Sequence, residues 1–288
     1  MARNEKNKLT ASELLKGAYD LHTHSNPSHI PRGLDDFELA READCRGMAG
    51  MMMKCHYEPT AARAYIANLY AGAAKTKLYG SVTLNWPVGG LNPFAVESGL
   101  RMGGKFIWMP TKDTAHCLTF GNMHGDFLIR PGLTIFDGEG RIKKEVLEII
   151  EITKKYEVFL GTGHLSPRES FALCKAARAL GGNMVLTHPD WERTKISLSD
   201  QIELTRLGVI IEKCWINTVD GSSSLEEIAS SIKAIGPEHV CLTTDRGQIN
   251  VEHPAEALRL FIEALLGHGL SASDITTMVQ TVPKMIIG

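Results

Sequence analysis

Short apolar runs alternate with amphipathic stretches along almost the whole chain, and this alternation limits the folds that the sequence can adopt. The apolar runs are rich in Val, Ile, Leu and Met and show little polar alternation, as expected for strands in a sheet covered on both faces. We expect strands at residues 18–22, 48–54, 78–84, 105–109, 158–161, 183–187, 208–212 and 240–244. We expect helices at residues 36–46, 60–71, 93–102, 143–155, 168–180, 199–207, 225–235 and 255–266. Strands that alternate with helices in this way are parallel strands joined by crossovers.

The length of the chain fits a closed barrel. Its 288 residues slightly exceed the roughly 250 residues that are typical of a (β/α)8 barrel. We therefore predict an α/β fold, a single-domain (β/α)8 TIM barrel over residues 1–288, with residues 1–15 as an N-terminal extension or helix. An open, doubly wound sheet is the alternative, but no G-x-G-x-x-G sequence follows the first strand and the chain has no P-loop motif.

The composition gives no support for a nucleic-acid or membrane partner. The chain has 31 basic and 33 acidic residues and is nearly neutral. The N-terminus has no apolar signal-peptide core, and the longest apolar stretch, near residues 47–53, is too short to span a bilayer. The six cysteines form no C-x-x-C pair, as expected for the reduced thiols of a cytoplasmic protein. We expect a cytoplasmic protein with a small-molecule substrate, and we further expect a homo-oligomer.

Ionisable side chains end or follow one predicted strand after another. His22 and His24 stand at the end of the first strand, where residues two apart project from the same face, with Asp20 one step deeper on that face. The other such residues are Lys54 and His56 after the second strand, His164 after the fifth, His188 after the sixth, Glu212 on the seventh and Asp245 after the eighth. Active sites of (β/α)8 barrels lie at the carboxyl ends of the strands, so we expect these side chains to meet at the barrel mouth.

Imidazoles and carboxylates in this pattern are typical of a transition-metal site. Two or three neutral imidazoles and one carboxylate bind zinc and leave a position open for water, whose pKa then falls toward neutrality. A nearby Asp or His can take the proton of this water and pass it to a leaving group. The predicted metal ligands are His22, His24, His164, His188 and Asp245. The predicted cofactor is a divalent ion, zinc first and manganese or iron as alternatives, and the predicted catalytic residues are Asp245, His188 and Lys54.

Four further side chains are weaker candidates for substrate contacts. Arg246 could bind a substrate carboxylate in a bidentate manner or could form an ordinary ion pair. Glu212 could contact substrate or could be a paired carboxylate at the edge of the core. His116 lies in the long segment of residues 110–143, which we expect to pass over the barrel mouth. His56 is the fourth candidate.

Short motifs spread over almost the whole chain carry a family resemblance. They are Asp20-Leu21-His22-Thr23-His24-Ser25, Lys54-Cys55-His56-Tyr57-Glu58-Pro59-Thr60, Leu91-Asn92-Pro93, Trp108-Met109-Pro110-Thr111, Gly163-His164-Leu165-Ser166-Pro167, Thr187-His188-Pro189 and Thr244-Asp245-Arg246-Gly247-Gln248. The His-x-His pair on the first strand, with the later His and Asp residues, resembles the amidohydrolase superfamily of TIM-barrel metal hydrolases. Within this superfamily the chain closely resembles an uncharacterised family of predicted metal-dependent hydrolases. The resemblance implies the barrel fold and the metal site, whereas it implies no substrate.

The fourth strand departs from the pattern of the superfamily. Many members carry a lysine or glutamate there that bridges two metal ions, whereas residues 105–110 of this chain offer no such group. Lys54 on the second strand could take this part, either as a carbamate or as a cation, or could simply extend to solvent. The missing bridge favours one metal ion over two.

The leading functional hypothesis is a metal-dependent hydrolase that acts on an amide, cyclic amide, lactone or ester bond of a small molecule. One alternative is non-oxidative decarboxylation, because aminocarboxymuconate-semialdehyde decarboxylase and its relatives use a similar single-metal site without a bridging lysine. Another is phosphoester hydrolysis, because residues 20–25 also resemble the opening of PHP-domain phosphoesterases. Those enzymes need a trinuclear cluster with more ligands, and their barrels have seven strands. Loops determine the shape of the pocket, so the motifs do not identify the substrate.

Overall fold

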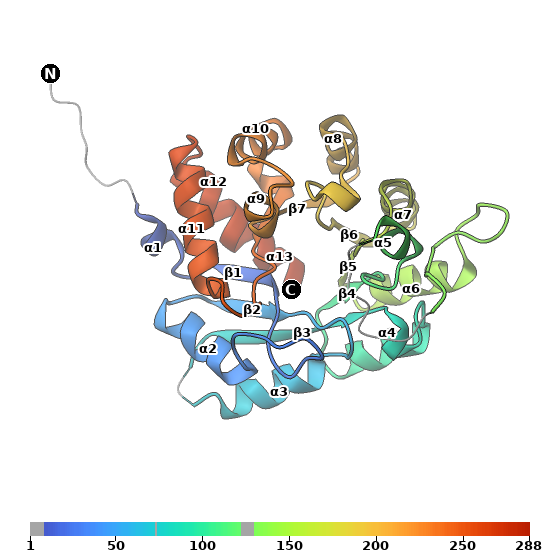
Figure 1. Cartoon of the computed structure of the whole chain (residues 1–288), viewed down its shortest axis with the longest axis horizontal. Helices are drawn as coiled ribbons and strands as arrows, with labels where there is room; N and C mark the ends of the chain where they lie inside the picture. Colours follow the sequence, from blue (N-terminus) through green and yellow to red (C-terminus); the bar gives the residue numbers. More distant parts are fainter. Residues whose placement is uncertain (1–8, 73, 122–129) are drawn as a thin grey trace, which may run out of the picture.

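Eight parallel strands form the barrel that the sequence predicts. The computed structural model describes residues 9–72, 74–121 and 130–288. Neighbouring strands pair in chain order from β1 to β8 (Figure 1). The strands are β1 (Tyr19–Thr23), β2 (Gly50–Met53), β3 (Lys77–Thr83), β4 (Phe106–Trp108), β5 (Phe159–Gly161), β6 (Asn183–Leu186), β7 (Ile210–Cys214) and β8 (Val240–Thr243). Each strand overlaps the run predicted for it.

Backbone hydrogen bonds just beyond β8 close the sheet onto β1. The amide of Asp245 donates to the carbonyl of His22 over 2.8 Å, and the amide of His24 donates to the carbonyl of Arg246 over 2.8 Å. Thr23 and Arg246 form a parallel bridge at the same place. Barrel closure therefore brings the ends of β1 and β8 side by side, at the two positions where the sequence predicts metal ligands.

Long helices follow the strands and cover the outside of the barrel (Figure 1). They are α2 (Asp36–Cys45), α3 (Ala61–Tyr70), α4 (Pro93–Arg101), α6 (Lys144–Lys155), α7 (Pro167–Ala179), α8 (Leu198–Arg206), α10 (Leu225–Ile235) and α11 (Pro254–Gly267). Each overlaps a predicted helix. The caps are local sequence signals: Ser166 starts α7 through a reciprocal capping box with Glu169, and Ser224 starts α10 in the same way with Glu227.

Helix α1 (Ala11–Leu14) lies within the N-terminal extension or helix expected at residues 1–15, whereas several other short helices were not predicted from the sequence. They are α5 (Ala115–Phe120), α9 (Ile216–Val219), α12 (Ala272–Thr276) and α13 (Val282–Ile287), with single turns at Trp86–Val88, Glu192–Thr194 and Pro237–His239 and a π-helical segment at Thr277–Thr281. Segments this short contain too few residues to show a helical period. Helix α5 lies in the long segment predicted to pass over the mouth, of which residues 122–129 lie outside the described part.

An apolar base fills the amino-terminal end of the barrel. Its buried members are Leu21, Met52, Phe106, Trp108, Phe159, Val185, Ile210 and Cys241 from the strands and Val282, Ile286 and Ile287 from α13. The C-terminal helix thus closes this end of the barrel, since it packs against early strand residues such as Leu21 and Phe159. A larger apolar cluster separates the strands from the surrounding helices. The site must therefore lie at the other, carboxyl end.

The position predicted for Asp20 is wrong. A strict period of two would place Asp20 on the face of His22 and His24, but the pairing of β1 with β2 is irregular between Asp20 and Thr23. Leu21 enters the interior cluster instead. The Asp20 carboxylate accepts hydrogen bonds from the amide and hydroxyl of Thr244, at 3.2 and 2.5 Å, and burial raises its pKa to about 7.

Among the described residues, no helix is both long enough and apolar enough to cross a membrane.

Candidate metal centre

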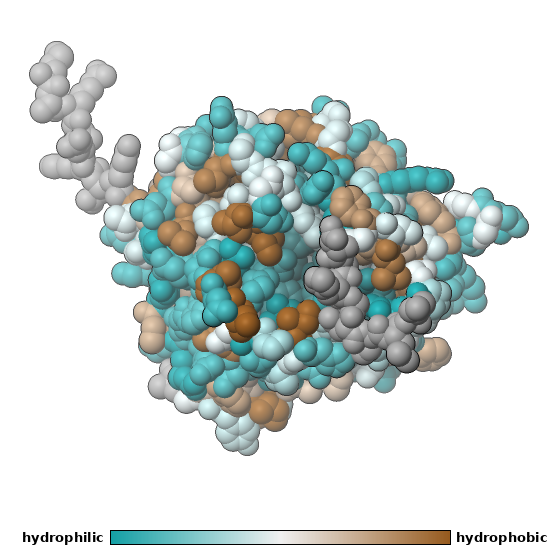
Figure 2. All heavy atoms as spheres, viewed as in Figure 1, coloured by the Kyte–Doolittle hydropathy of each residue, from teal (hydrophilic) through white to brown (hydrophobic). Residues whose placement is uncertain are grey.

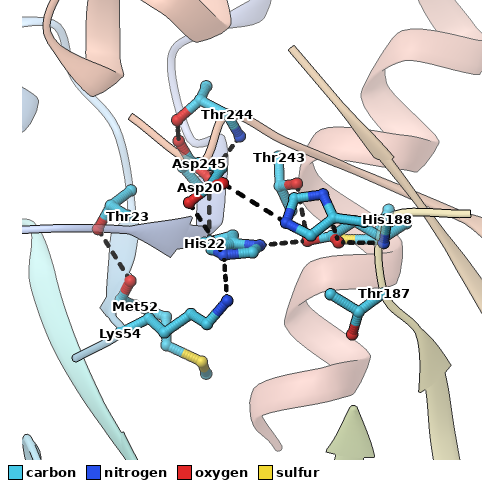
Figure 3. Close-up of polar contacts among 12 residues, drawn as sticks. Asp20, His22, Thr23, Met52, Lys54, Thr187, His188, Thr243, Thr244 and Asp245 are labelled. Carbon is cyan, nitrogen blue, oxygen red and sulfur yellow. Dashed lines mark hydrogen bonds and ion pairs between the residues drawn. The ribbon is translucent and has the colours of Figure 1, made fainter. Parts of the chain in front are cut away.

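The ionisable residues at the strand ends meet at the carboxyl end of the barrel. Figure 3 shows His22, Lys54, His188 and Asp245 directed toward one another. Donor atoms of His22, His188 and Asp245 lie within 4.8 Å of one another. These residues are far apart in the sequence, and they meet because parallel strands of a barrel all end on the same side.

Five buried imidazole rings form a closed circuit at this end. The distances between ring centroids are 5.8 Å from His22 to His24, 5.0 Å on to His56, 6.0 Å on to His164, 5.7 Å on to His188 and 4.9 Å back to His22. All five residues are buried. We call these five residues the imidazole circuit. Buried ionisable side chains are normally paired with one another or coordinate a metal ion, so the circuit makes this end of the barrel the candidate ligand site.

Asp245 is the carboxylate that faces the circuit. Its Oδ1 lies 2.8 Å from His24 Nε2 and 3.2 Å from His22 Nε2, and its Oδ2 lies 3.4 Å from His188 Nε2. Burial raises the pKa of the Asp245 carboxyl, but the surrounding imidazoles outweigh burial and hold it well below its usual value. Asp245 is therefore an ionised carboxylate whose oxygens face three imidazole nitrogens.

Glu212 on β7 orients two members of the circuit. Its Oε1 lies 2.7 Å from His22 Nδ1 and accepts from the Thr243 hydroxyl over 2.9 Å, while its Oε2 accepts from the backbone amide of His188 over 2.9 Å. Burial raises the pKa of Glu212, but His22 and His188 lower it to about 2. Both oxygens are engaged, which favours an orienting role over contact with a substrate. A carboxylate on Nδ1 leaves Nε2 of His22 directed at the site, as is usual for metal-binding histidines.

Lys54 enters the site from β2. Its Nζ lies 2.8 Å from His22 Nε2 and 4.6 Å from the centroid of the Trp108 ring. Lys54 is buried rather than extended to solvent, and burial lowers the pKa of its ammonium group. Trp108 stands near the end of β4, where many amidohydrolases carry the bridging lysine or glutamate, so an aromatic wall replaces that group here.

The backbone adopts uncommon conformations at three site positions. His188 has φ 49° and Asp245 has φ 52°, both in the left-handed region that non-glycine residues seldom occupy. Such conformations cost about 1–3 kcal/mol each and cluster at functional sites. Gly163, before His164, also has positive φ, and a Cβ atom there would lie 2.3 Å from the carbonyl oxygen of Met109. Only glycine allows β5 to turn this close to the end of β4 and so place His164 in the circuit.

Three of the buried imidazoles, those of His24, His56 and His164, are in the neutral form that binds metal. Burial lowers the pKa of His24 to about 3, and burial together with neighbouring cationic groups lowers the pKa of His56 and of His164 well below the usual value. These rings are therefore neutral near pH 7, with a free lone pair on one nitrogen.

His164 provides the test of whether a metal ion fits. Both of its ring nitrogens are buried and neither has a hydrogen-bond partner among the residues that the structure describes. Leaving a buried polar atom unpaired costs about 1–3 kcal/mol, and coordination of an ion removes that cost. The donor set of neutral imidazoles and one carboxylate is the set that zinc and similar ions prefer. The residues present thus fit a divalent transition metal.

The remaining sequence candidates divide into two groups. His56 joins the circuit, and its Nδ1 lies 2.8 Å from the Thr111 hydroxyl. His116 instead bonds to the backbone carbonyl of Arg193 over 2.6 Å. The Arg246 guanidinium forms an ion pair with Glu252 at 2.7 Å. Of the two roles considered for Arg246, the structure therefore favours the ordinary ion pair over contact with a substrate carboxylate.

A small cavity adjoins the circuit, and four of its residues were not predicted from the sequence. It encloses about 90 Å³ and is lined by His164, His188, Trp191, Ile216, Asn217, Asp220 and Asp245. The four residues, Trp191, Ile216, Asn217 and Asp220, lie a few positions beyond the ends of β6 and β7, and this position after a strand is the sequence feature that could have indicated them. Figure 2, in the same view as Figure 1, shows a hollow near the centre of the molecule where the barrel lies.

The sequence of this chain matches the model of one protein family. The model of DUF6282, described as a family of unknown function, matches residues 17–212, and the chain belongs to this family. The match includes the whole imidazole circuit together with Lys54 and Glu212, and it ends before Asp245. A comparison with curated protein sequences gave no match.

Solved structures share the barrel. An amidohydrolase from Pseudomonas aeruginosa aligns with a TM-score of 0.63 at 11% identity over 97% of this chain and 98% of that one. An organophosphorus hydrolase from Deinococcus radiodurans aligns with a TM-score of 0.61 at 13% identity over 97% and 94% of the two chains. A TatD homologue from Escherichia coli aligns with a TM-score of 0.55 at 14% identity over 95% and 98%. At this identity the likeness confirms the (β/α)8 fold and nothing finer.

Proposed function

We propose that this protein is a metal-dependent hydrolase of the amidohydrolase superfamily that acts on an amide, cyclic amide, lactone or ester bond of a small molecule. The observation that carries the proposal is the imidazole circuit around the ionised carboxylate of Asp245. The folds of an amidohydrolase and of an organophosphorus hydrolase support it.

We infer that His22, His24, His188 and Asp245 would hold the ion, with His164 as a further candidate ligand. When bound, a divalent ion supplies Lewis-acid activation of water and of the scissile carbonyl. Zinc suits this donor set best, and manganese or iron are the alternatives. Glu212 keeps the His22 ring in the orientation that this binding requires.

The chain's own residues supply the proton transfers. Asp245 Oδ2 is the atom that accepts the proton of the attacking water, and the same carboxyl then donates it to the leaving nitrogen or oxygen. His188 Nε2 lies 3.4 Å from Asp245 Oδ2, and its backbone amide donates to Glu212, so its ring would be held at the site as a ligand. Lys54 Nζ, 2.8 Å from His22 Nε2, would stabilise negative charge that develops on the substrate.

Decarboxylation is the second candidate. Trp108 stands near the end of β4 in place of a bridging lysine or glutamate, and this supports a single-metal site of the kind that non-oxidative decarboxylases use. A PHP-like phosphoesterase is less favoured, because the barrel has eight strands rather than seven.

Elemental analysis tests the metal site. Purified protein should carry about one equivalent of zinc or a related ion. Replacing both His22 and His24 by Ala should abolish metal uptake and leave the far-UV circular dichroism of the barrel unchanged. His239→Ala with His268→Ala is the matched control, because these histidines lie outside the circuit. Full metal occupancy in the His22/His24 double variant would refute the ligand assignment.

A substrate panel tests the reaction. Metal-loaded protein should hydrolyse at least one ester, lactone or lactam, and the His22/His24 double variant should not. Release of carbon dioxide from a carboxylated substrate without hydrolysis would favour the decarboxylase alternative.

We also propose a cytoplasmic homo-oligomer. The six cysteines are all free thiols, which supports a reducing compartment. Light scattering on the purified protein measures the oligomeric state.

A further inference from the structure

The cavity beside the imidazole circuit contains an amide side chain whose role the metal centre does not explain. Asn217 lies on α9, directly after β7, and its side chain is 1% exposed. Neither its Oδ1 nor its Nδ2 has a hydrogen-bond partner among the described residues. A buried amide with both atoms unpaired is costly to fold, so a buried asparagine in this condition indicates a group that meets a ligand.

Hydrogen bonds fix the backbone around Asn217, whereas no hydrogen bond among the described residues engages its side chain. The amides of Trp215 and Ile216 donate to the carbonyls of Thr243 and Thr244, which ties the start of α9 to the end of β8. The carbonyl of Asn217 accepts from the amide of Ser223 over 2.9 Å. The side chain is therefore presented to the cavity from a fixed position, as a recognition group must be.

The cavity places Asn217 together with the residues of the proposed chemistry. Its lining also includes His164, His188 and Asp245 from the metal centre. Trp191 adds a ring whose centroid lies 5.1 Å from that of His164. The volume of about 90 Å³ holds several water molecules, and hence one small group of a substrate rather than a long chain.

The hydrogen-bonding groups of the Asn217 carboxamide indicate which substrate group would fit beside it in the cavity. Asn217 offers one acceptor, Oδ1, beside one donor group, Nδ2, and two such atoms pair with an N–H and a C=O that lie side by side. A cyclic amide presents this edge because its ring forces the amide to be cis. A lactone presents oxygen acceptors alone and would leave Oδ1 buried and unpaired. Asp220, exposed at the rim of the cavity, adds a carboxylate that disfavours an anionic substrate at this side.

We propose that Asn217 is a specificity residue that recognises the N–H/C=O edge of a cyclic amide, such as a lactam, cyclic imide or cyclic urea, and so selects cyclic amides over lactones and esters. This inference rests on the proposed hydrolase function and narrows its substrate class. In a cyclic imide, Asn217 pairs with the N–H and one carbonyl, and the second carbonyl stays available for attack at the metal centre.

Matched ligands test the recognition of the N–H. Glutarimide and N-methylglutarimide differ only in the N–H, and their dissociation constants are measured by calorimetry on metal-loaded protein. Wild-type protein should bind glutarimide at least about tenfold more tightly than its N-methyl analogue. Asn217→Leu should bring the two constants within about twofold, whereas Asn217→Asp, which keeps an acceptor for the N–H but cannot donate to the carbonyl, should bind both imides more weakly and still prefer glutarimide. Thr218→Ala, on the same helix but outside the cavity, should keep it.

A stability measurement separates recognition from a structural role. Asn217→Leu removes two unpaired buried polar atoms, so its Tm should stay level or rise by about 2–4 °C. A Tm lower by several degrees would show that the amide supports the fold, and it would overturn the inference. A preference for glutarimide that persists unchanged in Asn217→Leu, or no binding of either imide, would overturn it as well.

Turnover of the same compounds and of δ-valerolactone distinguishes this inference from the hydrolase proposal. Hydrolysis with a preference that does not depend on Asn217 leaves the hydrolase in place and removes the inference. Selective binding of glutarimide that Asn217→Leu abolishes, with no hydrolysis of any substrate in the panel, supports the recognition role and counts against the hydrolase.

Discussion

Neutral imidazoles and one ionised carboxylate are the residue-scale basis of the site. Burial lowers the pKa of His24 to about 3, while the imidazole nitrogens around Asp245 keep the pKa of its carboxyl well below the usual value. The two shifts have different causes, because burial lowers the pKa of His24, whereas it raises the pKa of Asp245 and is outweighed there by the surrounding histidines. Both residues are therefore in the state that binds a cation without prior loss of a proton.

Asp245→Asn should lower kcat about a hundred- to ten-thousand-fold, because asparagine keeps the size of the side chain but cannot accept the proton. The measurement is steady-state kinetics on metal-replete protein, with metal content checked in each preparation. Asp137→Asn, outside the cavity and the imidazole circuit, is the matched control, and its kcat should stay near the wild-type value. A near-wild-type kcat for metal-replete Asp245→Asn would remove the proposed base.

Lys54→Ala separates a bridging role from a contact with substrate. The Lys54 ammonium lies beside His22 Nε2 and packs on Trp108, so we expect it to act on charge that develops in the substrate. Metal content should then remain at the wild-type level while turnover falls. Exposed Lys144→Ala is the control for loss of a lysine. A halved metal content in Lys54→Ala would instead show a bridging carbamate between two ions.

At the scale of elements, a buried ion pair links the segment after β6, which contains His188, to β7. Lys213 on β7 is fully buried, and its Nζ lies 2.9 and 2.8 Å from the two carboxylate oxygens of Asp190, two residues after His188. The amide oxygen of Gln201 on α8 accepts a third hydrogen bond over 2.9 Å. β6, β7 and α8 are therefore tied together just outside the imidazole circuit.

Lys213→Met should reduce the free energy of unfolding by about 3–5 kcal/mol, because it leaves the Asp190 carboxylate buried without its partner. Urea denaturation measures this change, and Lys213→Met with Asp190→Leu should recover part of it. The exposed pair of Lys175 and Glu203 between α7 and α8 provides the control, since Lys175→Met should cost about 0–1 kcal/mol. Equal effects of Lys213→Met and Lys175→Met would contradict the proposed fastening.

At the scale of the whole molecule, the barrel is closed at one end and functional at the other. Helix α13 buries Val282, Ile286 and Ile287 in one apolar cluster with strand residues such as Leu21 and Phe159. The carboxyl end, by contrast, is lined by ionisable side chains that would be costly to bury under another helix. The apolar end therefore contributes to the free energy of folding, whereas the buried ionisable groups at the polar end reduce it.

Ile286→Ala should destabilise the whole barrel by about 2–5 kcal/mol, because it opens a cavity in the base of the barrel. Calorimetry should show one cooperative transition at a lower Tm. Met285→Ala, on the neighbouring and exposed position of the same helix, should change stability by less than about 0.5 kcal/mol. A small effect at Ile286 would mean that α13 does not close the barrel in solution.

The strands, the long helices and the residues at the strand ends could be read from the sequence, because they depend on local patterns. The apolar runs predict the strands, caps such as that of Ser166 predict helix starts, and His22, His164 and His188 lie at or within three residues of the strand ends. Only the tertiary structure decided how the strand ends are used. The irregularity in β1 turns Asp20 away from the site, the left-handed backbone turns His188 and Asp245 into it, and Asn217 comes to line the cavity. Glu212 reaches His22 across 190 positions of sequence, a pairing that arises when the barrel closes and that no local pattern encodes.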